Sequence, residues 1–97
     1  MVHRRSAQAD RDLDDIWYRI ATESGNLPLA DRIIDKIAGQ FLRLAQFPEL
    51  GRTRDHDFGA GRRSWAATDY IIVYAVSGAD VLILRVVHGR RDIAALL

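Results

Sequence analysis

Residues 88–92, HGRRD, gather a histidine, two arginines and an aspartate directly after the apolar run at residues 81–87. Arginine holds phosphates and carboxylates through a planar fork of N–H donors, and histidine exchanges protons near neutral pH because its ordinary pKa is about 6.5. Core packing explains the apolar run but gives no reason for the charges behind it. The segment therefore predicts either a charged strand exit or a surface that contacts an anionic group or a partner.

Three of these residues also have structural interpretations. His88, at a strand end, can donate a ring N–H to a neighbouring carbonyl and fix the turn made by Gly89. Arg91 and Asp92 can pair with each other or with helix ends, an interaction worth roughly 0 to 1 kcal/mol at a solvated surface. The sequence leaves the structural and the contact interpretations open.

Arg85 is the least expected charge, because it interrupts a strand face that we assign to Val81, Ile83 and Val87. A guanidinium in that place must reach solvent, a buried carboxylate or the carboxylate of a partner. The pattern predicts a carboxylate near Arg85 without saying which element or partner supplies it.

The composition is that of one small globular domain over residues 1–97, with 48% hydrophobic residues, 28% charged residues and a net charge of +1. This net charge is too small to indicate nucleic-acid binding by itself. Lysine and arginine total 14, and Lys36 is the only lysine. Either binding surfaces or a high-GC genome would produce such a bias toward arginine.

The chain contains no cysteine, which excludes disulfides and thiolate metal sites and favours an intracellular setting. No apolar run approaches the roughly 18 residues of a membrane span, and the first residues lack the apolar segment of a signal peptide. We therefore expect a cytoplasmic protein that makes no membrane contact and needs no cofactor or metal.

A first helix is expected over residues 9–24, where apolar residues recur at helical spacing. Ser6 or Asp10 can cap it, and Gly25 can stop it. Its first turns carry four aspartates, Asp10, Asp12, Asp14 and Asp15. The helix dipole favours negative charge there, and the spacing splays the carboxylates around the helix. The cluster therefore indicates helix-end electrostatics rather than a metal site.

A second helix is expected from Asn26 to about Phe47, because Pro28 fits a first turn and Pro48 disfavours continuation. The connection between the two helices is so short that they must form an antiparallel hairpin. Trp17 is then expected inside this hairpin.

After a loop over residues 48–61, strand-like runs follow at residues 62–68, 69–76 and 81–88, with a hairpin turn at residues 77–80. The last run is apolar on both faces except for Arg85 and His88, so it belongs inside the sheet. An initial strand at residues 2–6 is only weakly signalled. The predicted fold class is α+β: an antiparallel two-helix hairpin packed on a three- to four-stranded antiparallel sheet.

The hairpin covers one face of this sheet, and no predicted element covers the other. Apolar residues such as Ile71 and Val73 would then lie exposed, which usually marks a binding surface. The pattern predicts a partner that completes the core.

Four segments together resemble the ParE branch of the RelE/ParE toxin superfamily, small toxins of type II toxin-antitoxin pairs. They are ADRDLDDIWYRIA in the first helix, PELGR at residues 48–52, GRRSWAATDYIIVYAV at residues 61–76 and LRVVHGRRDI at residues 84–93. The resemblance covers nearly the whole chain. It implies the fold given above and a ParD-like antitoxin whose disordered segment folds along the toxin. DNA would be contacted only indirectly, through the antitoxin.

The resemblance implies one of two mechanisms. ParE-type toxins contact DNA gyrase and trap cleaved DNA, whereas RelE-type toxins cleave messenger RNA on the ribosome with basic side chains and a general acid. Arg91 and His88 are the candidates for nuclease chemistry, but a lysine in the loop or strands and an aromatic or histidine acid near the chain end are missing. The resemblance favours a gyrase inhibitor rather than an enzyme. A metal-independent endoribonuclease and an inert antitoxin-binding module are the alternatives.

The candidate site residues fall into two groups. The charged group, expected to contact the target or the antitoxin, comprises Arg62, Arg85, His88, Arg90 and Arg91. The apolar group, expected to line the antitoxin groove, comprises Trp17, Trp65, Ile71 and Val73.

Overall fold

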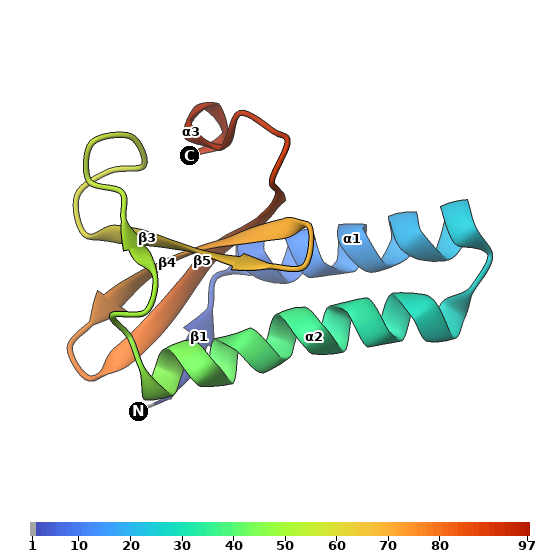
Figure 1. Cartoon of the computed structure of the whole chain (residues 1–97), viewed down its shortest axis with the longest axis horizontal. Coiled ribbons are helices and arrows are strands. Elements are labelled where there is room, and N and C mark those ends of the chain that lie inside the picture. Colours follow the sequence, from blue (N-terminus) through green and yellow to red (C-terminus); the bar gives the residue numbers. More distant parts are fainter. Residues whose placement is uncertain (1) are drawn as a thin grey trace.

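The computed structural model describes residues 2–97 and contains three helices and five strands in that range. In chain order these are β1 (His3–Arg5), α1 (Ala7–Ser24), α2 (Leu27–Gln46), β2 (Arg52–Thr53), β3 (Arg62–Ala67), β4 (Tyr70–Ser77), β5 (Asp80–His88) and α3 (Ile93–Leu96). The α+β class and the antiparallel helix hairpin are as predicted (Figure 1).

The ends of both long helices follow from local sequence. The Ser6 hydroxyl caps α1 by accepting a hydrogen bond from the Ala9 N–H, and Gly25 ends the helix in the left-handed conformation at φ 65°. The Asn26 side chain caps α2 by accepting from the Leu29 N–H, and Pro28 lies in its first turn. The predicted helix bounds are therefore confirmed to within two residues.

The sheet is larger and less regular than predicted. Its order is β1-β5-β4-β3-β2, and β1 pairs with β5 in parallel while the other pairs are antiparallel. The expectation of a purely antiparallel sheet of three to four strands was thus wrong in two respects, because Arg52–Thr53 adds a fifth strand and β1 runs parallel to its neighbour. A sequence carries no local signal for the direction in which distant strands pair. The placement of β5 inside the sheet is confirmed.

One face of the sheet holds the main core. The hairpin of α1 and α2 packs against it, and the apolar side chains between the layers are almost completely shielded from solvent (Figure 1). The largest fully buried members are Phe41, Ile37 and Leu44 of α2 and Tyr74, Ile72, Ile83 and Val81 of the sheet. The helix hairpin therefore covers one face of the sheet, as its apolar stripes predicted.

The other face is not bare, which corrects the expectation of an uncovered sheet. In Figure 1 the loop between β2 and β3 and the short helix α3 lie on the side of the sheet opposite the hairpin. Phe58 from this loop and Ile93 from α3 bury Val73 and Val87 in a second, smaller cluster. A four-residue helix and a single loop phenylalanine leave no periodic pattern, so sequence reasoning missed this layer.

The PELGR segment has a clear structural function. The hydroxyl of the fully buried Tyr74 accepts a hydrogen bond from the Gly51 N–H at 2.8 Å and donates one to the Pro48 carbonyl at 2.7 Å. Burial raises the pKa of Tyr74 above its ordinary value, so the hydroxyl keeps its proton. Arg63 also donates to the Gly51 carbonyl at 2.7 Å. The segment therefore fastens the end of α2 to the middle of the sheet.

Candidate functional site

A bulge in β5 sets the geometry of the candidate site. Val73 pairs with Arg85 but Tyr74 pairs with Ile83, so Leu84 is an extra residue on the β5 side. Ser6, at the start of α1, donates its hydroxyl proton to the Leu84 carbonyl at 2.7 Å. The bulge is therefore held by the residue that also caps α1.

The bulge changes which side chains share a face. Val81, Ile83 and Val86 lie in the core under the helices, whereas Val87 lies in the second cluster. The prediction that Arg85 shares one face with Val81, Ile83 and Val87 assumed strict alternation and was wrong for Val81 and Ile83, because Arg85 pairs with Val73 of the second cluster, on the face of Val87. An extra residue shifts the phase of every side chain that follows it.

The carboxylate predicted near Arg85 belongs to Asp12 of the same chain. Its Nε and Nη2 atoms donate to the two Asp12 carboxylate oxygens at 2.8 and 3.0 Å, and its Nη1 donates to the Leu96 carbonyl at 3.0 Å. The side chains of Arg85 and Asp12 are only 17% and 15% exposed. Hydrogen bonding to Asp12 raises the pKa of Arg85. Arg85 thus joins α1 to the C-terminal helix.

Asp12 accepts a further hydrogen bond from the Val86 N–H at 2.9 Å, so it anchors the backbone of β5 just after the bulge. Asp10, Asp14 and Asp15 are exposed on α1, as helix-end electrostatics predicts. That interpretation was incomplete for Asp12, which lies beside the apolar stripe and faces the sheet. Its place directly before Leu13 and four residues before Ile16 is the signal that could have identified it.

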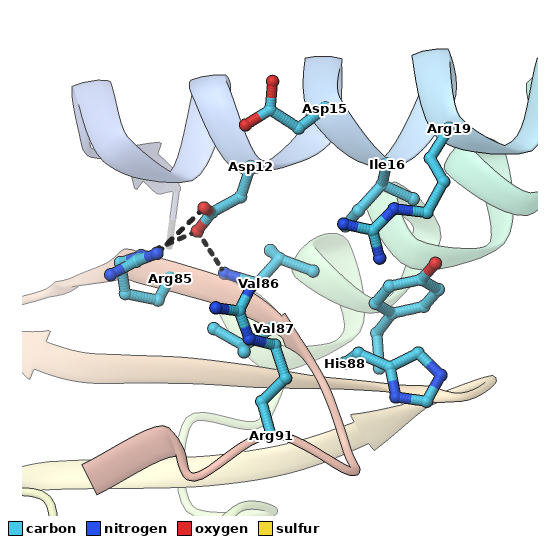
Figure 2. A pocket seen from close by; sticks show the side chains of 10 residues that line it. Asp12, Asp15, Ile16, Arg19, Arg85, Val86, Val87, His88 and Arg91 are labelled. Carbon is cyan, nitrogen blue, oxygen red and sulfur yellow. Dashed lines mark hydrogen bonds and ion pairs between the residues drawn. The ribbon is translucent and has the colours of Figure 1, made fainter. Parts of the chain in front are cut away.

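The Asp12–Arg85 pair forms one end of a small cleft between α1 and the end of β5, shown in Figure 2 and called the charged cleft below. Its volume is about 70 Å³. Its lining consists of Asp12, Asp15, Ile16, Arg19, Tyr70, Arg85, Val86, Val87, His88 and Arg91. The structure therefore brings Arg85, His88 and Arg91, three of the predicted charged residues, to one place.

His88 fixes the turn after β5, but not in the predicted way. Its Nδ1 atom accepts a hydrogen bond from the Arg90 N–H at 3.1 Å, whereas the ring was expected to donate to a carbonyl. The imidazole also stands edge-on to the Tyr70 ring, with centroids 5.3 Å apart. Burial is the main cause that raises the pKa of the Tyr70 hydroxyl, which stays protonated at neutral pH. His88 is thus held in position at the end of the cleft.

The other charged candidates differ in their surroundings. Arg62 is half-buried and donates to the Phe58 carbonyl at 3.0 Å, so it supports the loop over the second cluster. Arg90 and Arg91 are exposed, and neither forms an ion pair with any residue in the range 2–97. The suggested pair between Arg91 and Asp92 is therefore not formed.

The four apolar candidates do not share a surface. Trp17 lies half-buried in the hairpin and donates its indole N–H to Asp31 at 2.8 Å, and Trp65 packs on the main core and donates to Gln40 at 2.8 Å. Ile71 and Val73 belong to the second cluster on the opposite face, where Val73 is fully buried. A single groove lined by all four is not present in this structure, because the expectation assigned to one surface residues that belong to three different packing environments.

Sequence reasoning missed three further residues of the charged cleft: Asp15 and Arg19 on α1 and Tyr70 at the start of β4. The helix supplies one wall of the cleft, and only the tertiary packing of α1 on β5 reveals it. Within residues 2–97, no three histidine, aspartate or glutamate side chains converge as a metal site would require. No helix in the same range is long and apolar enough to span a membrane.

Comparisons with known proteins agree with this architecture. The model of a family described as the ParE toxin of the type II toxin-antitoxin system parDE matches residues 4–93. Toxin ParE3 of Caulobacter vibrioides is 34% identical over 93 residues, covering 96% of this chain and 91% of the relative. A solved structure described as the chromosomal ParDE TA system from P. aeruginosa shares the fold, with a TM-score of 0.78 at 23% identity over 91% of this chain and 95% of that one. The chain therefore belongs to the ParE toxin family of type II toxin-antitoxin systems.

Proposed function

We propose that this ParE-family toxin inhibits DNA gyrase by protein contact through the charged cleft, and that a ParD-like antitoxin neutralises it. The observation that carries the proposal is the composition of the cleft. Arg85 is already paired with Asp12, which leaves Arg19, Arg91 and His88 as the groups able to meet a partner. Such a set is suited to recognition by complementary charge.

The same composition disfavours bond cleavage. A nuclease of this fold needs several cations to stabilise a pentavalent phosphorus and an acid to protonate the leaving oxygen. In the charged cleft Asp12 and Asp15 offset much of the positive charge, and the single lysine of the chain, Lys36, lies on α2 and does not line the cleft. Contact without chemistry needs only a surface of matching shape and charge.

The proposal is tested with purified gyrase. Supercoiling of relaxed plasmid is measured with increasing toxin, and detergent and protease are then added to reveal cleavage complexes. We expect loss of supercoiling and linear DNA that appears only with the toxin. Normal supercoiling with protein shown to be folded would refute the proposal.

A second function, ribosome-dependent cleavage of messenger RNA, is favoured by one observation: His88 and Arg91 line the same cleft. This function predicts transcript cleavage on translating ribosomes that is lost in both His88→Ala and Arg91→Ala. Cleavage by the wild type that survives both substitutions would exclude the charged cleft as its site.

For the antitoxin we propose a different surface, at the C-terminal end of α2. Leu42 and Phe47 are 62% and 59% exposed there, and two shallow hollows meet at Gln46. One hollow is lined by Val2, His3, Leu42 and Ala45, and the other by Phe47, Pro48, Glu49 and Leu50. Exposed apolar side chains that adjoin one another are typical of a surface covered by a partner.

The affinity of the antitoxin for Leu42→Arg tests this surface. Replacing a buried interface leucine by a charged residue is expected to weaken binding about 100-fold or more, equivalent to roughly 3 kcal/mol. Tyr18→Arg serves as the matched control, because Tyr18 is similarly exposed but lies on α1. Equal losses in both variants, or none in Leu42→Arg, would argue against this surface.

A further inference from the structure

Two arginines of the charged cleft have guanidinium groups without an acidic partner in the described part of the chain. Arg19 comes from α1 and Arg91 from the turn after β5, and neither forms an ion pair within residues 2–97. Arg85, in the same cleft, makes three hydrogen bonds through its guanidinium. The cleft therefore contains one arginine that is used structurally and two whose donors are available.

The two available arginines enter the cleft from different sides. Figure 2 shows Arg19 extending from α1 toward the sheet, while Arg91 extends from the turn after β5 back toward Val87. His88 stands between α1 and that turn, and its Nδ1 atom is occupied by the Arg90 N–H. In the neutral imidazole the proton is then on Nε2, which adds a donor at the same place. The cleft presents donors on several sides, and at its Arg85 end both carboxylate oxygens of Asp12 already accept hydrogen bonds.

Size and charge decide what these donors would hold. The volume of about 70 Å³ is far below the roughly 300–1,000 Å³ of sites that enclose a whole small molecule, so the cleft admits only the end of a side chain. Asp12 and Asp15 also line it and would repel a polyanion such as a nucleic-acid strand. A planar carboxylate matches the fork of an arginine and brings a single negative charge.

We infer that the charged cleft takes one carboxylate, from an aspartate or glutamate side chain of the protein that this toxin contacts, held by Arg19, Arg91 and His88. This inference rests on the proposed contact function and names the chemistry of its anchor. The Asp12–Arg85 pair supports the site structurally, because it fixes the spacing between α1 and β5.

Acetate is the first probe, because it is the carboxylate without a partner attached. Acetate is titrated into the labelled full-length protein at constant ionic strength while NMR signals of arginine side chains and of the His88 ring are followed. We expect saturable shifts at Arg19, His88 and Arg91 that are lost in Arg19→Gln and in Arg91→Gln. Arg32→Gln, an exposed arginine on α2, is the matched control and keeps them.

Absence of saturation, or saturation unchanged in both cleft variants, would overturn the inference. A short single-stranded oligonucleotide is titrated in parallel. Saturation of the same signals by the oligonucleotide at lower concentration than acetate would identify the cleft as a nucleic-acid site and overturn it as well.

The gyrase assay gives the second readout and separates the two claims. The double variant Arg19→Gln/Arg91→Gln is expected to reach half-inhibition of supercoiling only at a concentration about tenfold or more above that of the wild type. The reason is that the carboxylate of the partner would then be buried without its two arginines. Wild-type potency in this variant would refute the carboxylate anchor and leave gyrase inhibition standing. Inactive wild-type protein that still binds acetate saturably would refute the gyrase target and leave the carboxylate site standing.

Discussion

The two faces of the sheet are stabilised in different ways. The face under α1 and α2 buries a large cluster in which Phe41, Ile37 and Tyr74 are fully shielded. The opposite face buries only Phe58, Val73, Val87 and Ile93 as a cluster, under one loop and a four-residue helix. Two long helices form the first layer, whereas the second consists of short segments held by hydrogen bonds such as those from Arg62 to the Phe58 carbonyl and from Arg85 to the Leu96 carbonyl.

This difference shows where the fold is robust and where it depends on individual residues. The charged cleft lies where the two layers meet, because Arg85 contacts both Asp12 on α1 and the Leu96 carbonyl on α3. Changes to the helix-covered core should therefore cost the most stability. Changes to the second layer should lower the free energy of unfolding by less, and should act through the hydrogen bonds and ion pair that hold this layer in place.

The largest effect is expected from a matched pair of phenylalanines, one in each layer. Phe41→Ala leaves a cavity between rigid helices and sheet and should lower the free energy of unfolding by about 4 kcal/mol. Phe58→Ala should lower it by about 2 kcal/mol, because the loop that carries Phe58 can close on the gap. Denaturant unfolding of both variants measures this, and equal losses would remove the contrast between the layers.

The next largest effect is expected at the Asp12–Arg85 ion pair, which links the two layers. Asp12→Ala leaves the Arg85 Nε and Nη2 atoms and the Val86 N–H without their acceptor and the Arg85 charge without its counter-ion, and should cost about 3 kcal/mol. Adding Arg85→Met removes the uncompensated charge, so the double variant should regain part of the loss. Asp14→Ala, on the exposed side of α1, is the control and should change stability by less than about 0.5 kcal/mol. A double variant no more stable than Asp12→Ala would contradict the pairing.

A smaller effect is expected at the anchor of the PELGR segment. A Cβ on Gly51 would overlap the Tyr74 hydroxyl oxygen and lie 2.8 Å from the Ser64 carbonyl oxygen, so Gly51→Ala should cost about 1–3 kcal/mol. Gly39→Ala is the matched control, because nothing lies within 4 Å of its Cβ and helix propensity favours alanine. Thermal unfolding should show Gly51→Ala below the wild type and Gly39→Ala at or above it. The reverse order would show that the anchor is dispensable.

The smallest effect is a pH dependence on the helix-covered side. His3 lies against Phe41, and burial, followed by the charge of Arg5, lowers the pKa of His3 below 6.5. Because protonation is harder in the folded chain, stability should fall as pH drops through 6.5 and the unfolded chain takes up the proton. His3→Gln should lose this part of the dependence in melting curves recorded between about pH 5 and pH 7.5. An unchanged slope in His3→Gln would assign the dependence to other groups.

The two layers also differ in how far the sequence predicts them. Helical periodicity and the capping residues Ser6, Gly25 and Asn26 define the hairpin, and alternation with a turn at residues 77–80 defines β4 and β5. The second layer has no such signal, since Phe58 is one aromatic residue in a polar loop. Strand direction at β1 was also out of reach, because its partner lies almost 80 residues away in the chain.

The candidate site was predictable from one strand only. His88, Arg91 and Arg85 stand close together in the sequence, so their common location was foreseen. The bulge at Leu84 was not, and it decides that Val86 faces the helices while Val87 faces the second layer. Asp12 and Arg19 reach the cleft from α1, a contact between residues about 70 positions apart that no local pattern encodes.

The most direct test of the central claim, that the charged cleft contacts gyrase, is site-specific cross-linking. The chain has no cysteine, so Asp15→Cys at the cleft and Asp35→Cys on α2 each provide a single attachment point for a photoreactive group. We expect efficient cross-links to gyrase from position 15 and few or none from position 35, although both sites are exposed and both changes remove one negative charge. Cross-links from position 35 with none from position 15, in protein that still inhibits supercoiling, would show that gyrase does not contact the charged cleft.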